Sequence, residues 1–220
     1  MSAQADQHIP DGIVIDENGI TPEIRYIIDL VEEGSQVLDL GCGSGNLLKA
    51  LQAEKGARAQ GIDLAEECIH ICVSKGLFVY HGDLDEGLAD FNDKSVDYVI
   101  STNTLQVLHH PQNLLREMAR VGKKLIISVP NFGHWSVRAQ LFILGRMPKT
   151  ARIPYEWYDS PNIHHTTIKD FRDLCRKMDL KILREIPLRT GDDGSCKRVR
   201  FLPNLLADYA IFLVEPSMEN

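Results

Sequence analysis

Short apolar runs alternate with helical patterns along the chain between residues 36 and 130. Five runs have the length and the β-branched or aromatic content of buried strands: 36–40, 57–63, 77–83, 96–102 and 124–130. Three of the segments between them repeat apolar residues at helical spacing and end near a glycine. Strands and helices in this alternation predict a doubly wound, mostly parallel α/β sheet that is covered on both faces.

Further elements flank this series. A helix is expected from Thr21, with Thr21 as its cap and Pro22 in its first turn, whereas residues 1–20 show no sustained periodicity and form a lead-in. After the fifth strand the pattern predicts a helix within 131–147, a second helix at 167–178, and two closing strands at 180–189 and 207–216. Thr167 and Asp170 resemble a capping box at the start of the second helix. These elements make one domain, 21–220, with a seven-stranded sheet. Residues 131–166 form an insertion at its rim that could serve as a lid.

Composition narrows the classes of function. The 220 residues carry a net charge of −7, and the one dense basic stretch, 196–200, is short, so nucleic acid and anionic lipid are unfavourable partners. No apolar run reaches the ~20 residues of a membrane span, and the polar N-terminus lacks the apolar segment of a secretion signal. We therefore expect a cytoplasmic protein without a membrane partner.

The five cysteines do not indicate a metal or disulfide framework. Their number is odd, and they contain no CxxC pair. Cys68 and Cys72 would share one helical face, where a metal site competes with the alternative of buried thiols, and we expect the second.

The turn after the first predicted strand carries the first chemical motif, VLDLGCGSGNLL at 37–48. Gly41, Gly43 and Gly45 allow a tight turn and a close approach of backbone to a ligand, but the Lys-Ser/Thr pair of a phosphate-binding P-loop is missing. Asp39 would repel a pyrophosphate and favour an ammonium or sulfonium group. This combination indicates S-adenosylmethionine, or its product S-adenosylhomocysteine, as the ligand.

Two more acids end the next two strands. Asp63 lies 20 residues after Gly43, where a ribose can donate both hydroxyls, and Asp83 could accept from the amine of adenine. The expected cofactor pocket is completed by the residues that follow these acids and by one after the fourth strand: Leu64, Leu84 and Asn103. Over residues 35–130 the chain resembles the class I S-adenosylmethionine-dependent methyltransferases. The alternative is the same fold with a degenerate or empty pocket.

Catalytic residues are not assigned by the sequence. The segment after the fourth strand, STNTLQVLHHP, lacks the Asn/Asp-Pro-Pro-aromatic motif by which amino-group methyltransferases resemble one another. His109 and His110 are the nearest bases, or else polar residues that cap the helix starting near Pro111. Methyl transfer is an in-line displacement that alignment alone can accelerate, so the missing base does not exclude it.

Both tryptophans lie between residues 129 and 167. This concentration of aromatic and polar side chains is typical of an interface, although a cluster that packs the insertion onto the sheet is the alternative. The candidate substrate or partner contacts are Asn131, His134, Trp135, Tyr155, Trp157, Tyr158, Asn162 and His164.

Longer signatures at 82–100, 104–135, 145–175 and 203–214 resemble the MetW family of methionine biosynthesis proteins, over most of the chain from about residue 12. The resemblance implies a methyltransferase-like fold that acts with a homoserine O-acyltransferase, MetX, rather than through an established methylation. The chain departs from the family pattern at His109 and His110 and at the polar segment 191–198. Two functions therefore remain, an accessory subunit that activates an acyltransferase and a methyltransferase acting on a small metabolite. The first accounts for more of these residues.

Overall fold

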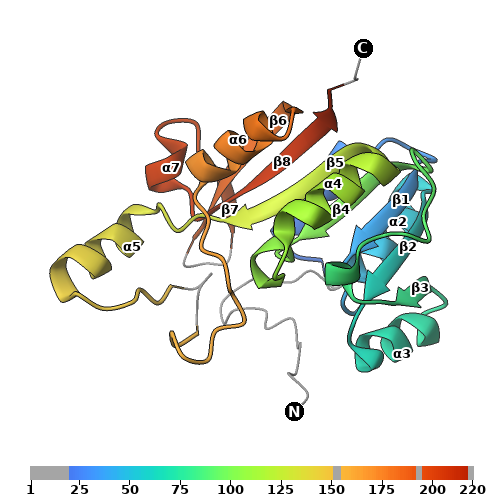
Figure 1. Ribbon diagram of the computed structural model, residues 1–220, viewed down its shortest axis with the longest axis horizontal. Coiled ribbons are helices and arrows are strands. Elements are labelled where there is room, and N and C mark those ends of the chain that lie inside the picture. Colours follow the sequence, from blue (N-terminus) through green and yellow to red (C-terminus); the bar gives the residue numbers. More distant parts are fainter. Residues whose placement is uncertain (1–19, 151–154, 192–194, 218–220) are drawn as a thin grey trace.

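The computed structural model describes residues 20–150, 155–191 and 195–217. Its centre is one eight-stranded sheet in the order β3-β2-β1-β4-β5-β8-β6-β7 (Figure 1). The strands are β1 (Gln36–Leu40), β2 (Arg58–Asp63), β3 (Phe78–His81), β4 (Val96–Thr102), β5 (Gly122–Pro130), β6 (Leu180–Thr190), β7 (Cys196–Arg198) and β8 (Tyr209–Pro216). The predicted α/β class and mostly parallel sheet are confirmed.

The first five strands are parallel, and β8 enters antiparallel between β5 and β6. The prediction of seven strands was wrong by one, because β7 pairs with the end of β6. This three-residue strand has two exposed basic side chains and no apolar alternation, so the sequence pattern does not distinguish it from a loop.

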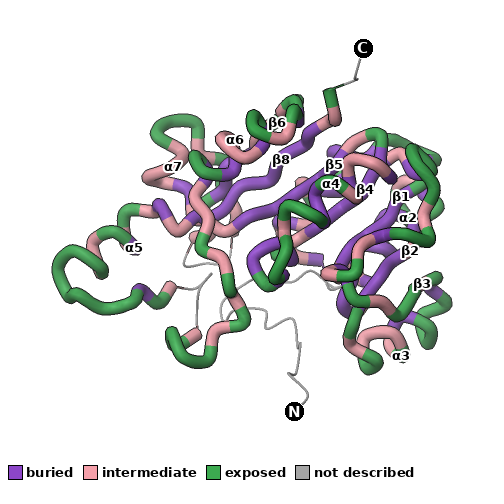
Figure 2. The backbone as a smooth tube through the Cα atoms, in the orientation of Figure 1, coloured by how far each residue is buried: buried purple, intermediate pink, exposed green. Residues whose placement is uncertain are grey.

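Helices cover both faces of the sheet. The helices α1 (Pro22–Leu30), α2 (Asn46–Lys55) and α3 (Glu66–Ser74) bury apolar side chains against one face. On the other face lie α4 (Pro111–Val121) and α6 (Ile168–Lys177), together with the 3-10 turns η1 (Leu84–Glu86) and η2 (Leu105–Val107). Successive residues of the central strands alternate between these two cores, as the pleat of a sheet requires, and Figure 2 shows the buried strands between the half-buried helices.

Two predicted helix caps are present. The Thr21 hydroxyl accepts a hydrogen bond from the Ile24 N–H at 3.3 Å, and the Thr167 hydroxyl accepts from the Asp170 N–H at 3.1 Å. Each satisfies a backbone donor that has no partner within its helix. The caps therefore fix where α1 and α6 begin.

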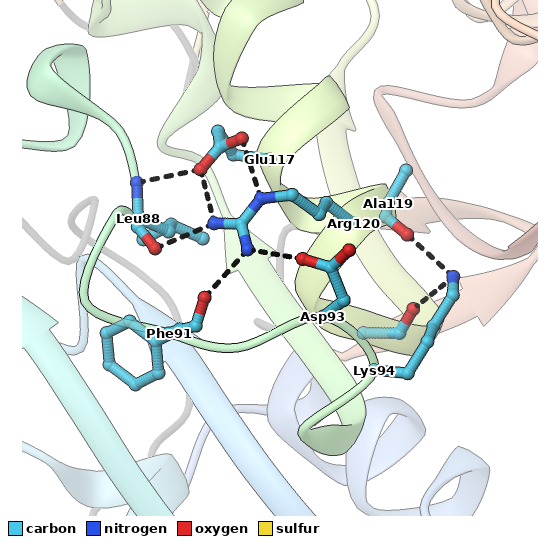
Figure 3. Close-up of polar contacts among 8 residues, drawn as sticks. Leu88, Phe91, Asp93, Lys94, Glu117, Ala119 and Arg120 are labelled. Atoms are coloured by element: carbon cyan, nitrogen blue, oxygen red, sulfur yellow. Dashed lines mark hydrogen bonds and ion pairs between the residues drawn. The ribbon is translucent and has the colours of Figure 1, made fainter.

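A single arginine fastens the connection between β3 and β4 onto α4 (Figure 3). The Arg120 guanidinium donates hydrogen bonds to two side chains and two backbone carbonyls, those of Glu117, Asp93, Leu88 and Phe91, at 2.6–3.0 Å. Charged donors make stronger hydrogen bonds than neutral ones, so this contact holds the 14-residue connection 82–95, which has little regular structure of its own.

Beyond β5 the chain leaves the sheet. The helix expected within 131–147 is present as α5 (Trp135–Ala139), which continues as one π-helical turn, η3 (Gln140–Leu144). A short helix, α7 (Pro203–Leu206), precedes β8. The first turn of α5 is held by His134, whose Nδ1 accepts from the Ser136 N–H, and Gly145 ends the helix in the left-handed conformation. Figure 1 shows α5 projecting past the end of β5, away from β1 and β2, rather than folding across them.

Candidate functional site at the carboxyl edge of the sheet

The loop between β1 and α2 turns through three glycines in the left-handed region. Gly41, Gly43 and Gly45 have φ angles of 74°, 52° and 75°. A Cβ on Gly41 would come within 2.8 Å of the Thr104 hydroxyl, and a Cβ on Gly45 within 2.4 Å of a Leu77 methyl. Side chains are excluded here by both backbone conformation and space, so bare backbone faces the end of the sheet.

Asp63, at the end of β2, is buried and organises this loop. One carboxylate oxygen accepts from the Gly43 N–H at 2.7 Å, and the other accepts from the Ala65 N–H at 2.9 Å. Each oxygen keeps a lone pair beyond these bonds. The acid expected to bind a ribose is thus already connected to the glycine turn, and it can accept further hydrogen bonds from a ligand.

Asp39 lies one strand over and is more deeply buried. Its carboxyl group is 2% exposed, and Oδ1 has no hydrogen-bond partner among the described residues. Burial, and to a smaller extent the nearby charge of Asp63, raise the pKa of Asp39 to about 7. A buried carboxyl group with an unpaired oxygen beside an open backbone loop is suited to a positively charged ligand group.

The third strand end differs. Asp83 is exposed, and its carboxylate accepts from the Asp85 N–H at 2.9 Å, which caps η1. Leu84 is buried within the core, whereas Leu64 is 60% exposed directly after Asp63. The carboxyl ends of β1, β2 and β3 are adjacent in the sheet, so the three predicted acids lie along one edge, at decreasing depth.

Asn103 follows β4 in the left-handed conformation, with φ 54°. Its N–H donates to the Ser128 hydroxyl at 3.2 Å, and its carbonyl accepts from the Gln106 amide at 2.8 Å. Non-glycine residues adopt this conformation at an energetic cost, and Asn tolerates it better than most. Since β4 neighbours β1, Asn103 belongs to the same edge as Asp39.

These residues fit an S-adenosylmethionine-like ligand. The glycine loop offers backbone without side chains, Asp39 offers an unpaired buried oxygen, Asp63 offers remaining acceptor sites, and exposed Leu64 offers an apolar surface. Sequence reasoning did not identify Thr104, whose hydroxyl donates to the Leu40 carbonyl at 3.0 Å and packs against Gly41. An isolated Thr in a loop carries no sequence signal for such a role.

His109 and His110, the candidate bases, are exposed and lie at the start of α4. Their backbone N–H groups donate to the two carboxylate oxygens of Asp85, at 3.1 and 3.0 Å. The Asp85 carboxylate thus satisfies the two backbone donors directly before α4, and the His110 side chain makes no capping hydrogen bond. No catalytic role follows for either imidazole.

The candidate partner contacts fall into two groups. Asn131 is buried, and its amide bonds to the backbone of Gly133, Ile168, Asn204 and Ala207, so this side chain holds the turn after β5. We leave it out of the proposed contact surface.

The other members lie nearer the surface. Trp135, Trp157 and Tyr158 are 48%, 72% and 71% exposed, and the last two rings meet edge to face. The remaining candidates are half-buried: His134, Tyr155, Asn162 and His164. Pro154, which directly precedes Tyr155 in the sequence, lies outside the described residues.

A further apolar feature was missed by sequence reasoning. Leu141, Phe142, Ile143 and Leu144, hereafter the apolar arm, are 40%, 92%, 74% and 63% exposed at the end of α5 (Figures 1 and 2). The sequence pattern placed these residues only within the helix expected at 131–147. In the structure the helix projects into solvent, and an exposed apolar cluster of this kind typically marks a contact site.

The described residues contain neither a candidate membrane span nor a candidate metal cluster. No helix with the length and hydropathy of a bilayer span was found there. No group of three or more His, Cys, Asp or Glu side chains is arranged to hold a metal ion in the same ranges.

Solved structures support the fold. A SAM-dependent methyltransferase from Thermotoga maritima, described as a possible histamine N-methyltransferase, superposes with a TM-score of 0.65 at 16% identity, over 89% of this chain and 88% of that one. At this identity the likeness concerns the fold alone, which many different activities share.

Curated relatives extend the comparison. The bifunctional methionine biosynthesis protein MetXA/MetW of Rhodopirellula baltica is 36% identical over 194 residues, which is 84% of this chain and 31% of that protein. A ubiquinone biosynthesis O-methyltransferase of Idiomarina loihiensis is 33% identical over 128 residues, or 53% of this chain and 52% of that enzyme. The chain thus spans about a third of the first relative and half of the second.

The family model described as methionine biosynthesis protein MetW matches residues 21–214. This range contains the glycine loop, the three acids at the strand ends and both tryptophans. Together with the Rhodopirellula relative, this match shows that the chain belongs to the MetW family.

Proposed function

We propose that this protein is an S-adenosylmethionine-binding accessory subunit that associates with a homoserine O-acyltransferase and activates it. The observation that carries the proposal is the Rhodopirellula protein, whose name joins MetXA and MetW in one polypeptide. Domains fused in one organism are held at high effective concentration, as the subunits of a complex are in another. A separate MetW chain would have to bind its acyltransferase through a surface of its own.

Two parts of the molecule support this role. For the ligand, Asp39 would face the sulfonium or ammonium group, Asp63 would accept from the ribose, and Leu64 would cover the adenine ring. Bound S-adenosylmethionine would supply a positive charge next to Asp39. As an end product of the pathway, this ligand would report methionine status to the acyltransferase.

For the partner, the proposed contact surface combines the apolar arm with Trp135, Trp157 and Tyr158. Aromatic side chains dominate the energetics of protein interfaces when they are buried there, and the most exposed rings gain the most. Phe142 and Trp157, at 92% and 72% exposed, are therefore the expected anchors.

The test is an acyltransferase assay with and without this protein, repeated across S-adenosylmethionine concentrations. We expect stimulation that varies with the ligand. Asp63→Ala should lose calorimetric S-adenosylmethionine binding yet still associate with the acyltransferase, which separates the two parts of the proposal. An acyltransferase whose rate and elution position are unaffected by this protein would refute the accessory role.

A methyltransferase acting on a small metabolite is the second candidate, favoured by the likeness to ubiquinone biosynthesis O-methyltransferase. His109 and His110 are then the first imidazoles along the chain after β4, and they are exposed to solvent, where an acceptor could reach them. Release of S-adenosylhomocysteine on incubation with a panel of hydroxylated and amino metabolites would favour this candidate, and no release from any of them would count against it.

A further inference from the structure

A hollow of about 470 Å³ lies on the α4 and α6 side of the sheet, apart from the glycine loop. Its apolar part is formed by the end of β5 and by the facing sides of α4 and α6, including Leu115, Val129 and Phe171. Its polar part comes from η2, the start of α4 and the segment 164–166. This volume is in the range of small-molecule sites, which typically combine an apolar body with a few polar groups.

Two polar atoms in its wall lack a partner among the described residues. Gln106 is 7% exposed, and its Oε1 makes no hydrogen bond, although its Nε2 donates to the Asn103 carbonyl at 2.8 Å. That bond fixes which end of the amide is the oxygen. The Nε2 atom of His164 is likewise buried without a partner. Leaving a buried acceptor unsatisfied costs on the order of 1–3 kcal/mol, so such atoms point to a missing donor.

Backbone hydrogen bonds join the two segments that carry these side chains. The Gln106 carbonyl accepts from the N–H groups of both Ile163 and His164, at 2.8 and 3.0 Å. The ring of His165 is held edge to face against Phe132, with centroids 4.5 Å apart. The polar wall is thus a connected piece of structure, formed by segments almost 60 residues apart in the sequence.

The charge of the wall restricts what can bind. The residues that line the hollow include four histidines, two glutamines, an asparagine and a threonine, but no Asp, Glu, Lys or Arg. An ammonium ligand would find no carboxylate in this wall. An anion is also unfavourable, because the Asp85 carboxylate already accepts from the N–H groups at the start of α4. A neutral ligand remains, with a group that donates to Gln106.

We propose that this hollow is a binding site for a neutral hydroxylated small molecule with an apolar, ring-sized body. Its hydroxyl group donates to Oε1 of Gln106 and meets Nε2 of His164, while the body packs on the half-buried apolar lining residues Pro111, Pro130 and Leu174. A hydroxyl group both donates and accepts, so it satisfies the amide oxygen and either tautomer of the imidazole. The site does not depend on the proposed accessory role.

The test uses p-cresol as the probe, titrated into the full chain and followed by amide chemical-shift changes. Toluene has the same body without the hydroxyl group, benzoate is an anion and benzylamine is a cation. We expect p-cresol to bind more tightly than these three, with the shift changes concentrated in residues 105–115 and 163–166. Binding of toluene as tight as that of p-cresol, or tighter binding of either charged probe, would overturn the proposal.

Two variants sharpen the result. Gln106→Leu keeps the size of the side chain and removes the acceptor, so the Kd for p-cresol should rise about tenfold. Gln112→Trp places a large ring at the exposed rim of the hollow, away from the core, and should block binding in a folded protein. If Gln106→Leu fails to fold, Gln112→Trp decides the matter. Unchanged p-cresol binding by this variant places the probe elsewhere and contradicts the proposal.

Discussion

The ends of β1 and β5 lie on the same edge of one sheet, yet they are constructed in opposite ways. At β1 the chain turns at once through three left-handed glycines, and Asp39 and Asp63 are buried beside it. At β5 it runs outward into α5 and exposes the apolar arm. A closed turn with buried charge suits a small ligand, whereas a projecting apolar helix suits a macromolecule. The difference assigns the two candidate roles to different parts of the edge.

The glycine turn should be the part least tolerant of change. Gly45→Ala combines a positive φ with a Cβ 2.4 Å from a Leu77 methyl and 2.8 Å from the Cys72 sulfur, so we expect a loss of about 3 kcal/mol in unfolding free energy. Urea unfolding measures it. Gly34→Ala is the matched control, since Gly34 has φ 71° but nothing within 4 Å, and it should lose only about 1 kcal/mol. Equal losses would show that crowding under the turn is unimportant.

The arginine that fastens the β3–β4 connection should come next. Arg120→Ala removes five hydrogen bonds from a charged donor, and we expect about 2 kcal/mol of destabilisation by urea unfolding. Arg176, whose side chain is 76% exposed in its pair with Asp173, is the control and should cost below about 0.5 kcal/mol as alanine. A change at Arg120 no larger than at Arg176 would mean that this connection is held by its apolar contacts.

The apolar arm should show the opposite behaviour, with an effect on association and none on folding. Phe142→Ala should leave the unfolding free energy within about 0.5 kcal/mol, because the ring is 92% exposed, yet weaken binding to the acyltransferase by about 2 kcal/mol. Calorimetry with the purified partner measures the second effect.

The matched control for the arm is Phe78→Ala. The Phe78 ring is 67% exposed on the edge strand β3, and three strands separate β3 from β5, which α5 follows. Trp157→Ala should behave like Phe142→Ala if both rings belong to one interface. Weakening by Phe78→Ala alone would move the interface to the opposite edge of the sheet.

The last prediction concerns pH. Since the pKa of Asp39 is raised to about 7, the free protein keeps this carboxyl group protonated below that pH, and a cationic ligand must displace the proton. Affinity for S-adenosylmethionine should fall about tenfold for each pH unit below 7, or about 1.4 kcal/mol, and level off above it. Calorimetry between pH 5.5 and 8 tests this, with Asp39→Asn as the variant that should lose the dependence.

The same ionisation also affects stability. The folded protein holds the Asp39 proton more tightly than the unfolded chain, where the pKa is 3.8, so the unfolding free energy without ligand should decrease as pH rises from about 4 to 7. Asp39→Asn should flatten this decrease. Parallel curves for the wild type and Asp39→Asn through this range would show that Asp39 is ionised in the free protein.

Local patterns predicted most of the fold. The bounds of β1 and β4 match the predicted runs, and Thr21 and Thr167 cap their helices, because these features depend on neighbours along the chain. Strand β7 was not predicted because its three residues, two of them exposed and basic, have no apolar alternation. The glycine turn could be located for the same local reason, although the S-adenosylmethionine contacts of its residues stay predictions.

The rest of the candidate sites depends on contacts distant in sequence. Asn131 looked available for a partner, but its four hydrogen-bonding positions are taken by backbone groups, three of them from residues 168–207. Cys72 was expected to act with Cys68 if at all, and in the structure its thiol donates to the Gly43 carbonyl at 3.2 Å. The hollow between α4 and α6 has no sequence signature, because Gln106 and His164 meet only through the folded backbone.

The position of β8 bears on how the molecule assembles. It is the last strand in chain order, yet it forms two ladders, with β5 and β6, and six of its eight residues are buried. Until it arrives, β5 and β6 each present an unpaired edge, and the sheet stays in two pieces. Assembly therefore waits for the most distant part of the chain, which slows folding and leaves a half-finished sheet open to aggregation.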